Sequence, residues 1–360
     1  MVIPMINLKH HLSNYTIHPD LFLSEKVASV WRYLNKEKIK STDAKTSGKS
    51  ITDKAQEFLT MVQSPGHEVK YGQLAARRHQ RLMNAILEPG VLEAIITSEP
   101  KQLADYARDL DAKLVNDDFV KTTARNSFSE LLMSNVFNYK TYRDSKFCAD
   151  LYISLYFSNA TCPYCNEYPV KVVQRINTKD KKLTLHFDLD HFYPKHHYPY
   201  LALSFYNHIP SCKYCNSLHK LQKKFAINTH IHPYVDHFDD FYDFEYSKHA
   251  LRGEKVKEVR LKKKNAPFVD NLCAELELED RYQSNLDYAR INHLIEILAD
   301  NSHLLFTADR NADDELKRLQ IRLADFGLIN TRSQILQKPW SKMQRDLVKL
   351  FDVNNVLLKD

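Results

Sequence analysis

The chain has 360 residues, is 43% hydrophobic and 27% charged, and carries a formal net charge of +6 at pH 7. This composition is ordinary for a globular protein and excludes a disordered chain or a fibre. Only six glycines occur, and none forms the G-x-G-x-x-G loop of a dinucleotide-binding enzyme. The one phosphate-loop look-alike, at residues 47–50 (SGKS), has Asp43 where that motif needs its first glycine.

Location is constrained by the absence of long apolar runs. No run approaches the roughly 18 residues of a membrane span, and the first residues lack the basic and apolar stretches of a secretory signal. We therefore expect a cytoplasmic protein that does not enter a membrane. The net charge is mild for this length, so only local clusters of basic residues argue for nucleic acid.

The first of three expected regions, residues 1–150, is predicted to be mainly helical. Apolar residues recur at helical spacing within 27–34, 55–62 and 103–114. The second region, residues 151–245, has two β-rich segments, 168–174 and 183–190, separated by the polar stretch 175–182. That order predicts a hairpin.

A helix is then predicted over residues 216–225, with Leu218, Leu221 and Phe225 on one apolar side. The third region, residues 246–360, opens with a basic, strand-like stretch, Arg252–Lys264, and continues with helices. The expected fold class is α+β.

Two C-x-x-C pairs dominate the second region: Cys162 with Cys165, and Cys212 with Cys215. Disulfides are rare in a reducing cytoplasm, and two such turns supply the four thiolates of a tetrahedral zinc site. We expect a structural zinc ion; two unrelated redox or buried pairs are the alternative. The remaining cysteines, Cys148 and Cys273, are expected to be buried as small hydrophobic residues.

Nine of the 17 histidines lie between residues 186 and 237. Within that window stand Asp188–Lys195 (DLDHFYPK), Asn207 and Cys212–Lys220 (CKYCNSLHK). The string resembles the HNH endonucleases, the ββα-metal class, and in particular the zinc-knuckled HNH effectors of Septu-type and some retron-linked anti-phage systems. The resemblance covers about residues 160–240 and implies a zinc-pinned ββα-metal nuclease core at the centre of a mainly helical chain.

The resemblance also implies roles for individual residues in metal-dependent hydrolysis of DNA. Asp190 and Asn216 would bind Mg²⁺ or Mn²⁺ through oxygen atoms, which such hard cations prefer. His191 would be the general base, since an imidazole titrates near neutral pH, and Asn207 would orient it.

Two positions stay open at this point. Asp188 is an alternative to Asp190, because both alternate onto the same face of a strand. His219 is either a further ligand of the cation or a phosphate contact.

Basic side chains around these motifs are candidates for DNA phosphate contacts, with a merely solvated surface as the alternative. The candidates are Lys195, Lys213, Lys220, Lys223 and Lys224, and the stretch Arg252–Lys264 is a weaker one. The acidic segment 232–243 (HPYVDHFDDFYD) could hold a second metal, but its spacing is irregular and we favour a structural role. We expect a solvated surface position for Glu167, His196, His197 and His208.

Two functions of another class remain: a zinc-dependent nucleic-acid-binding protein that does not cut, and a partner-binding helical scaffold with a vestigial nuclease core. The co-occurrence of Asp190, His191 and Asn216 argues against the protein that only binds, since binding does not need them, and the scaffold stays open as a second alternative. The resemblance further implies a regulatory partner, an ATPase sensor encoded nearby.

Overall fold

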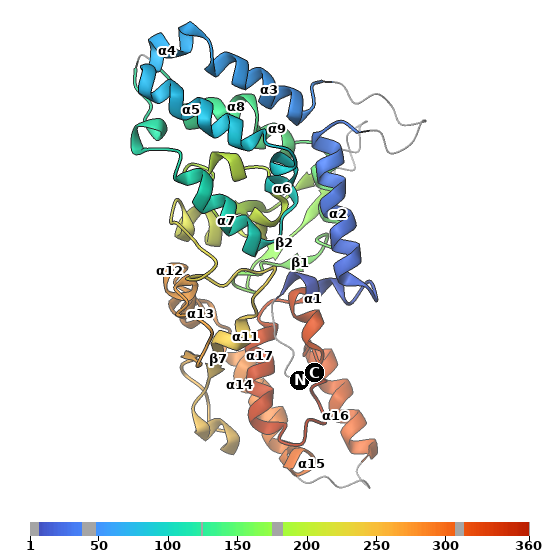
Figure 1. Ribbon diagram of the computed structural model, residues 1–360. Coiled ribbons are helices and arrows are strands. Elements are labelled where there is room, and N and C mark those ends of the chain that lie inside the picture. The colour runs from blue at the N-terminus through green and yellow to red at the C-terminus, as the bar shows by residue number, and fades with distance from the viewer. Residues whose placement is uncertain (1–6, 38–47, 124, 175–182, 307–312, 360) are drawn as a thin grey trace.

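The computed structural model describes residues 7–37, 48–123, 125–174, 183–306 and 313–359. Helices from the two ends of the chain lie on opposite sides of a middle part built from short strands and loops (Figure 1). The predicted α+β class is confirmed at the level of helices mixed with small antiparallel sheets. The polar stretch expected to be a hairpin turn, 175–182, lies outside the described residues.

The described residues between 7 and 154 are mainly helical, and the starts of these helices have clear local causes. Ser50 and Asp53 form a capping box at α3, as do Ser127 and Glu130 at α8. Proline occupies the first turn of α2, α4 and α7, where its missing N–H costs nothing. The helices are α1 (Leu8–Leu12), α2 (Pro19–Leu34), α3 (Ile51–Val62), α4 (Pro65–Tyr71), α5 (Gln73–Ile86), α6 (Val91–Thr97), α7 (Pro100–Asp111), η1 (Asn116–Phe119), α8 (Phe128–Asn135), α9 (Tyr139–Arg143) and α10 (Lys146–Ser154).

The strands are short and pair two by two, all antiparallel. The predicted hairpin exists as β3 (Val172–Gln174) paired with β4 (Leu183–Leu185). A smaller pair joins β1 (Ala160–Thr161) to β2 (Pro169–Val170) around the first C-x-x-C turn.

The prediction was wrong about the partner of the segment that carries Asp190. That segment forms a strand of its own, β5 (Asp188–His191), which pairs with a strand that was not predicted, β6 (His208–Ser211). The connection between them contains two 3₁₀ turns, η2 (Pro199–Leu201) and η3 (Phe205–Asn207). Asn207 therefore lies directly before β6, and His191 faces His208 across the pair.

The predicted helix after the second C-x-x-C pair is also different. It is a π-helix, η4 (Tyr214–Lys220), closed by a bond from the Leu221 N–H to the Asn216 carbonyl. Leu218 and Leu221, expected on the buried side, are 59% and 61% exposed, and Lys220 is buried instead. Only Phe225 of the expected apolar side packs into the core.

The last region begins with a strand pair and continues with helices. The basic stretch contributes β8 (Arg260–Lys263), which pairs with β7 (Tyr242–Glu245). The other elements are α11 (Phe238–Phe241), η5 (Lys248–Arg252), α12 (Leu272–Glu275), α13 (Leu278–Asn285), α14 (Tyr288–Asp300), α15 (Ser302–Phe306), α16 (Asp313–Phe326), η7 (Arg332–Gln337) and α17 (Ser341–Phe351). Within the described residues, no helix combines the length and the apolar character that crossing a bilayer requires.

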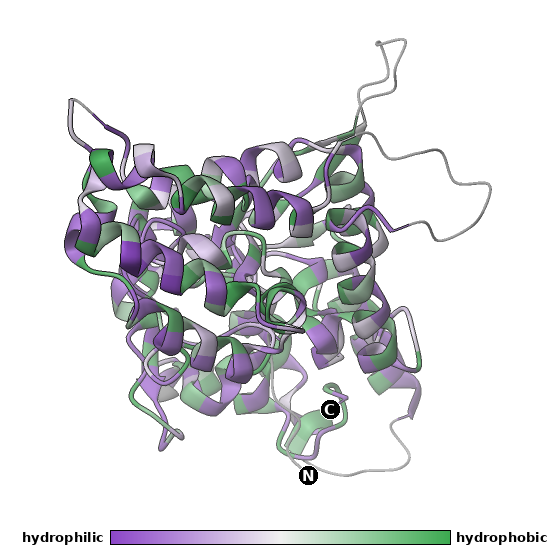
Figure 2. Ribbon diagram, turned by 45° about the horizontal axis from the view of Figure 1, so that its top comes forward, coloured by the Kyte–Doolittle hydropathy of each residue, from purple (hydrophilic) through white to green (hydrophobic). Residues whose placement is uncertain are grey.

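The buried apolar side chains form one contiguous cluster with members from all three regions. Many helices carry hydrophobic residues on one side and hydrophilic residues on the other (Figure 2). The first and last regions also touch directly, because Asn14 and Ser333 exchange hydrogen bonds next to α1 and η7. The strands of the middle part, such as the two-residue β1 and the four-residue β5, are thus held by packing rather than by their own length.

Candidate active site and metal centre

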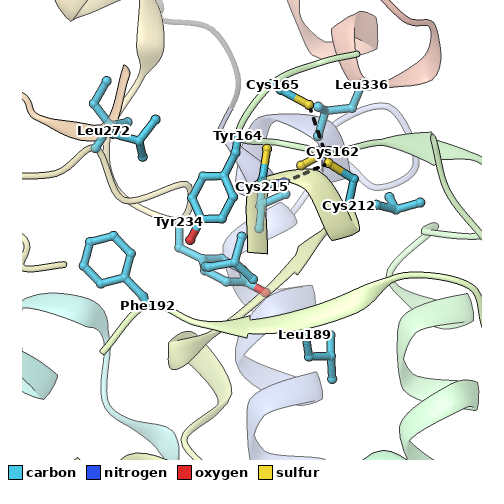
Figure 3. Packing of buried hydrophobic residues seen from close by; sticks show 14 of the residues in the cluster. Cys162, Tyr164, Cys165, Leu189, Phe192, Cys212, Cys215, Tyr234, Leu272 and Leu336 are labelled. Carbon is cyan, nitrogen blue, oxygen red and sulfur yellow. Dashed lines mark hydrogen bonds between the residues drawn. The ribbon is translucent and has the colours of Figure 1, made fainter. Parts of the chain in front are cut away.

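The four paired cysteines converge in the middle of the molecule (Figure 3). Their sulfur atoms all lie within 4.8 Å of one another and the residues are buried. The Sγ atoms of Cys165 and Cys212 are 3.9 Å apart, close to the roughly 3.8 Å edge of a tetrahedron with Zn–S bonds of about 2.3 Å. The set can therefore hold one metal ion such as zinc, and its four thiolates leave no open coordination position.

The third region reaches this cluster through α13. Arg281 donates a hydrogen bond to Cys215 Sγ at 3.4 Å and forms an ion pair with Glu167 at 2.9 Å. Tyr282 donates to the carbonyl of Cys165. Glu167 is only 6% exposed, so its expected position on a solvated surface was wrong. An arginine beside thiolates offsets the negative charge of a four-cysteine site.

A cleft of about 900 Å³ opens beside the cluster, over β5 and η4. Its lining brings together residues that are far apart in the sequence. Of the predicted site residues it contains Asp188, Asp190, His191, Lys195, Asn216 and Lys220. The predicted base and both candidate cation carboxylates therefore share one concave site with the helix asparagine.

His191 is held by a backbone carbonyl. Its Nε2 lies 3.1 Å from the oxygen of Ala202, and because a carbonyl only accepts, Nε2 carries the hydrogen and Nδ1 the lone pair. Nδ1 has no hydrogen-bond partner among the described residues and is not among the fully buried polar atoms. Burial, followed by the nearby His208 and Lys195, holds the pKa of His191 well below its usual range, so the ring is neutral at neutral pH.

His208 was expected on the surface, and that expectation was wrong. It is fully buried, packs edge-on against His191 with ring centroids 4.9 Å apart, and donates through Nε2 to the same Ala202 oxygen at 2.9 Å. Burial lowers the pKa of His208 to about 4. No residue near it in the sequence indicates this role; it follows from its place on β6 directly opposite His191.

Among the described residues, the Asn207 side chain forms its hydrogen bonds with Tyr193 and Leu201 and not with His191. The Asn207 side chain accepts from the Tyr193 N–H at 2.7 Å and donates to the carbonyls of Tyr193 and Leu201. The bonds to Tyr193 tie together the two ends of the β5–β6 connection. The bond to Leu201 holds the backbone directly before Ala202. Asn207 is thus connected to His191 through the backbone around Ala202, whose carbonyl accepts from the imidazole.

The two carboxylates of β5 have different partners. Asp190 is 2% exposed and accepts from Lys220 Nζ and from Tyr164 O–H, each at 2.8 Å. Asp188 accepts from Asn216 Nδ2 at 3.0 Å and from Ser217 Oγ at 2.8 Å. It is therefore Asp188, and not Asp190, that the structure brings into contact with Asn216.

Tyr164 and Lys220 connect the cysteine cluster to the cleft. Tyr164 stands between the two cysteines of the first C-x-x-C turn, and Lys220 ends the helix that follows the second. Both side chains are buried and both end on Asp190. A metal ion in the cluster would thereby fix the position of the cleft as well as the local fold.

The predicted phosphate contacts divide into two groups. Lys220 is 1% exposed and its ammonium group is bound to Asp190, so it is not on the basic surface where we expected it. Lys195 lines the cleft, 4.4 Å above the ring of Tyr139, and burial lowers its pKa. The exposed lysines of this segment are Lys213, Lys223 and Lys224.

The remaining candidate histidines lie at the rim of the cleft or outside it. His219 points to the third region, where its Nδ1 is 3.5 Å from Glu277, and it does not line the cleft. His196 lies exposed at the rim of the cleft, and His197 is half-buried.

Three carboxylates of the acidic segment and α17, those of Asp239, Asp243 and Asp346, also lie close enough together to hold an ion. The buried ammonium group of Lys342 is, however, within ion-pair distance of all three.

Comparisons of this chain with family models, with curated proteins and with solved structures find no match.

Proposed function

We propose that this chain is an HNH-type endonuclease that hydrolyses DNA phosphodiester bonds with the help of a divalent cation, as an effector of cytoplasmic anti-phage defence. The observation that supports it most is the state of His191. Its imidazole is neutral, fixed through Nε2, and shares a cleft with two carboxylates and the Asn216 amide. A protein that only binds nucleic acid has no use for a general base in this setting.

Hydrolysis requires removal of a proton from the attacking water. Nδ1 of His191 accepts that proton, because the hydrogen of the ring is committed to Ala202. His208 packs against the ring of His191, and Asn207 ties the backbone that carries Ala202. The ring is therefore held in the one orientation in which Nδ1 accepts the proton. Water approaches from the cleft.

The second requirement is relief of the charge that develops on the phosphate and the leaving oxygen. A bound Mg²⁺ or Mn²⁺ supplies this as a Lewis acid. Such cations take oxygen ligands, and the cleft offers them from the Asp188 and Asp190 carboxylates and the Asn216 amide. Zinc in the cysteine cluster has a structural role, because four thiolates complete its coordination.

DNA would lie along the cleft and the outer face of η4. Arg143 and Lys195 line the cleft, and Lys213 is exposed on the adjacent segment. Phosphate contacts of this kind supply affinity without sequence preference.

The helices at both ends of the chain exceed what hydrolysis alone requires. We propose that they bind a regulatory partner, an ATPase sensor subunit, because an unrestrained DNase would damage the DNA of its own cell. A pull-down with the protein encoded next to this chain tests this. A chain that cuts freely as a monomer and retains no neighbour contradicts it.

Cleavage of plasmid DNA in Mg²⁺ by the full chain and by His191→Ala tests the nuclease. We expect the variant to lose about a hundredfold or more of the activity, the usual contribution of a general base, while zinc content and melting temperature stay unchanged. His219→Ala is the matched control, since this histidine lies outside the cleft and its loss should leave cleavage intact. Full activity in His191→Ala contradicts the assignment. Zinc-dependent DNA binding without cleavage by the wild-type chain would instead support the non-cleaving alternative.

A further inference from the structure

The two aspartates of β5 enter the same cleft but differ in how their oxygens are used. Both oxygens of Asp190 are occupied by donors of the chain, Oδ1 by Lys220 and Oδ2 by Tyr164. Lys220 and Asp190 are buried to 1% and 2% exposure in their side chains. A second cation at Asp190 would lie beside a buried ammonium group, where repulsion is poorly screened.

Asp188 has no such competitor. Its bonded partners are neutral: the Asn216 amide and the Ser217 hydroxyl, both on Oδ2. Among the described residues, no lysine or arginine lies within ion-pair distance of it. Its carboxylate is partly exposed and lines the cleft.

Asn216 completes a pair of oxygen donors at this point. The amide now donates to Asp188 through Nδ2, and a half-turn of the amide places Oδ1 there instead. A carboxylate oxygen and an amide oxygen would then face one position, which is the donor set that Mg²⁺ and Mn²⁺ prefer.

We propose that Asp188, together with Asn216, binds the catalytic divalent cation, and that Asp190 is a positioning residue. This inference rests on the nuclease function proposed above. Lys220 donates to Asp190 and also to the carbonyl of His191. The Asp190–Lys220 pair thereby fixes the backbone that carries the base, and Tyr164 ties the pair to the cysteine cluster.

The test measures binding of Mn²⁺ alone to the full-length, zinc-loaded chain, by electron paramagnetic resonance of the free ion without DNA. Asp188→Asn should weaken Mn²⁺ binding by about tenfold or more, since loss of even a second-shell partner has effects of that size. Asp190→Asn keeps the same shape but leaves Lys220 buried without its counter-charge, so that variant can fail to fold. The double variant Asp190→Asn with Lys220→Met removes both charges together and is compared in its place.

The double variant should bind Mn²⁺ within about twofold of wild type, because neither residue is a proposed ligand or forms a hydrogen bond with one, and so neither belongs to the outer shell that tunes metal affinity. Its kcat for DNA cleavage should fall while KM stays unchanged, which distinguishes a positioning role from loss of cation or DNA binding. Loss of Mn²⁺ binding in the double variant with retention in Asp188→Asn overturns this inference and leaves the nuclease proposal standing. A wild-type chain that neither binds Mn²⁺ nor cuts DNA overturns both.

Discussion

Lys220 and Lys342 are two buried lysines that face aspartates in different parts of the molecule. Lys342, on α17, is within ion-pair distance of Asp239, Asp243 and Asp346, so one ammonium group faces three carboxylates. Lys220, on η4, faces only Asp190, while Asp188 two residues away keeps neutral partners. Proximity of acidic side chains therefore does not by itself identify a metal site. In the C-terminal cluster, a lysine of the chain already neutralises the carboxylates. In the cleft, a lysine pairs with Asp190 but not with Asp188.

The aspartates around Lys342 keep this buried lysine charged. Burial alone would lower the pKa of Lys342, but Asp346 and Asp239 outweigh the effect of burial and raise the pKa overall. His191 and His208 are also buried but have no carboxylate partner in the part of the chain that the structure describes, and burial lowers their pKa values. The cleft thus combines the Lys220–Asp190 ion pair with the neutral imidazole of His191.

The largest expected effect is loss of the metal from the cysteine cluster, because Tyr164 and Lys220 both depend on its two turns. Structural zinc contributes on the order of 10 kcal/mol in small domains. Cys212→Ser should therefore unfold the middle part and abolish cleavage, and elemental analysis should show about one zinc per wild-type chain. Cys148→Ser is the control: this cysteine is buried outside the cluster, and the variant should keep its zinc. A metal-free chain that melts at the wild-type temperature would refute a structural ion.

How much the sequence predicted can be seen at this cluster. C-x-x-C spacing is local, so the four ligands could be predicted without knowledge of the fold, and the buried cluster agrees with that prediction. The buried positions of Cys148 and Cys273 are also confirmed. The convergence of Asp190, His191 and Asn216 on one cleft could be predicted only through the resemblance, because they belong to separate elements.

The rest depended on long-range structure. A lysine-rich helix looks like a solvated face, yet the π-helical turn changes the angular position of each residue and exposes Leu218 while Lys220 points inward. β6 has only four residues and includes Pro210, so it carries no strand signal of its own. The burial of His208 and Glu167 follows from partners that are 17 and 114 residues away in the sequence.

The second prediction separates the two buried lysines. Lys342→Met and Lys220→Met each leave carboxylates without a counter-charge, so each should lower the free energy of unfolding by about 3–5 kcal/mol in urea. Only Lys220→Met should also lower kcat per folded molecule, because Lys342 does not line the cleft. Lys349→Met is the control at the rim of the C-terminal cluster. Its side chain is 34% exposed, so its loss should cost less than Lys342→Met. Equal loss of kcat in both buried variants would mean that Lys220 acts only through stability.

A smaller effect is expected from acid. The pKa of His208 is about 4 in the folded chain, below its ordinary value of 6.5. The unfolded chain therefore binds more protons below pH 6.5, and folding loses stability as the pH falls from 6.5 toward 4. For this imidazole the loss between pH 7 and pH 4.5 is about 2 kcal/mol. His208→Gln keeps an N–H donor for Ala202 without a titrating ring, so its unfolding free energy should decrease less over this range. An identical pH dependence of both proteins would show that His208 is not the titrating group.

The smallest effect on stability is expected from Lys213, which belongs to the same segment as Lys220 but is exposed. Lys213→Ala should change the unfolding free energy by less than about 0.5 kcal/mol, as is usual for surface sites, and should leave Mn²⁺ binding intact. If Lys213 contacts a DNA phosphate, the slope of log K against log salt becomes less steep by about 0.9. Lys101→Ala, an equally exposed lysine on α7 away from the cleft lining, should leave that slope unchanged. A slope that neither variant alters would mean that Lys213 is only solvated, and that DNA is held by the cations inside the cleft. In that case Lys220 would stabilise the fold and Lys213 would only be solvated, and the basic composition of this segment would not indicate DNA binding.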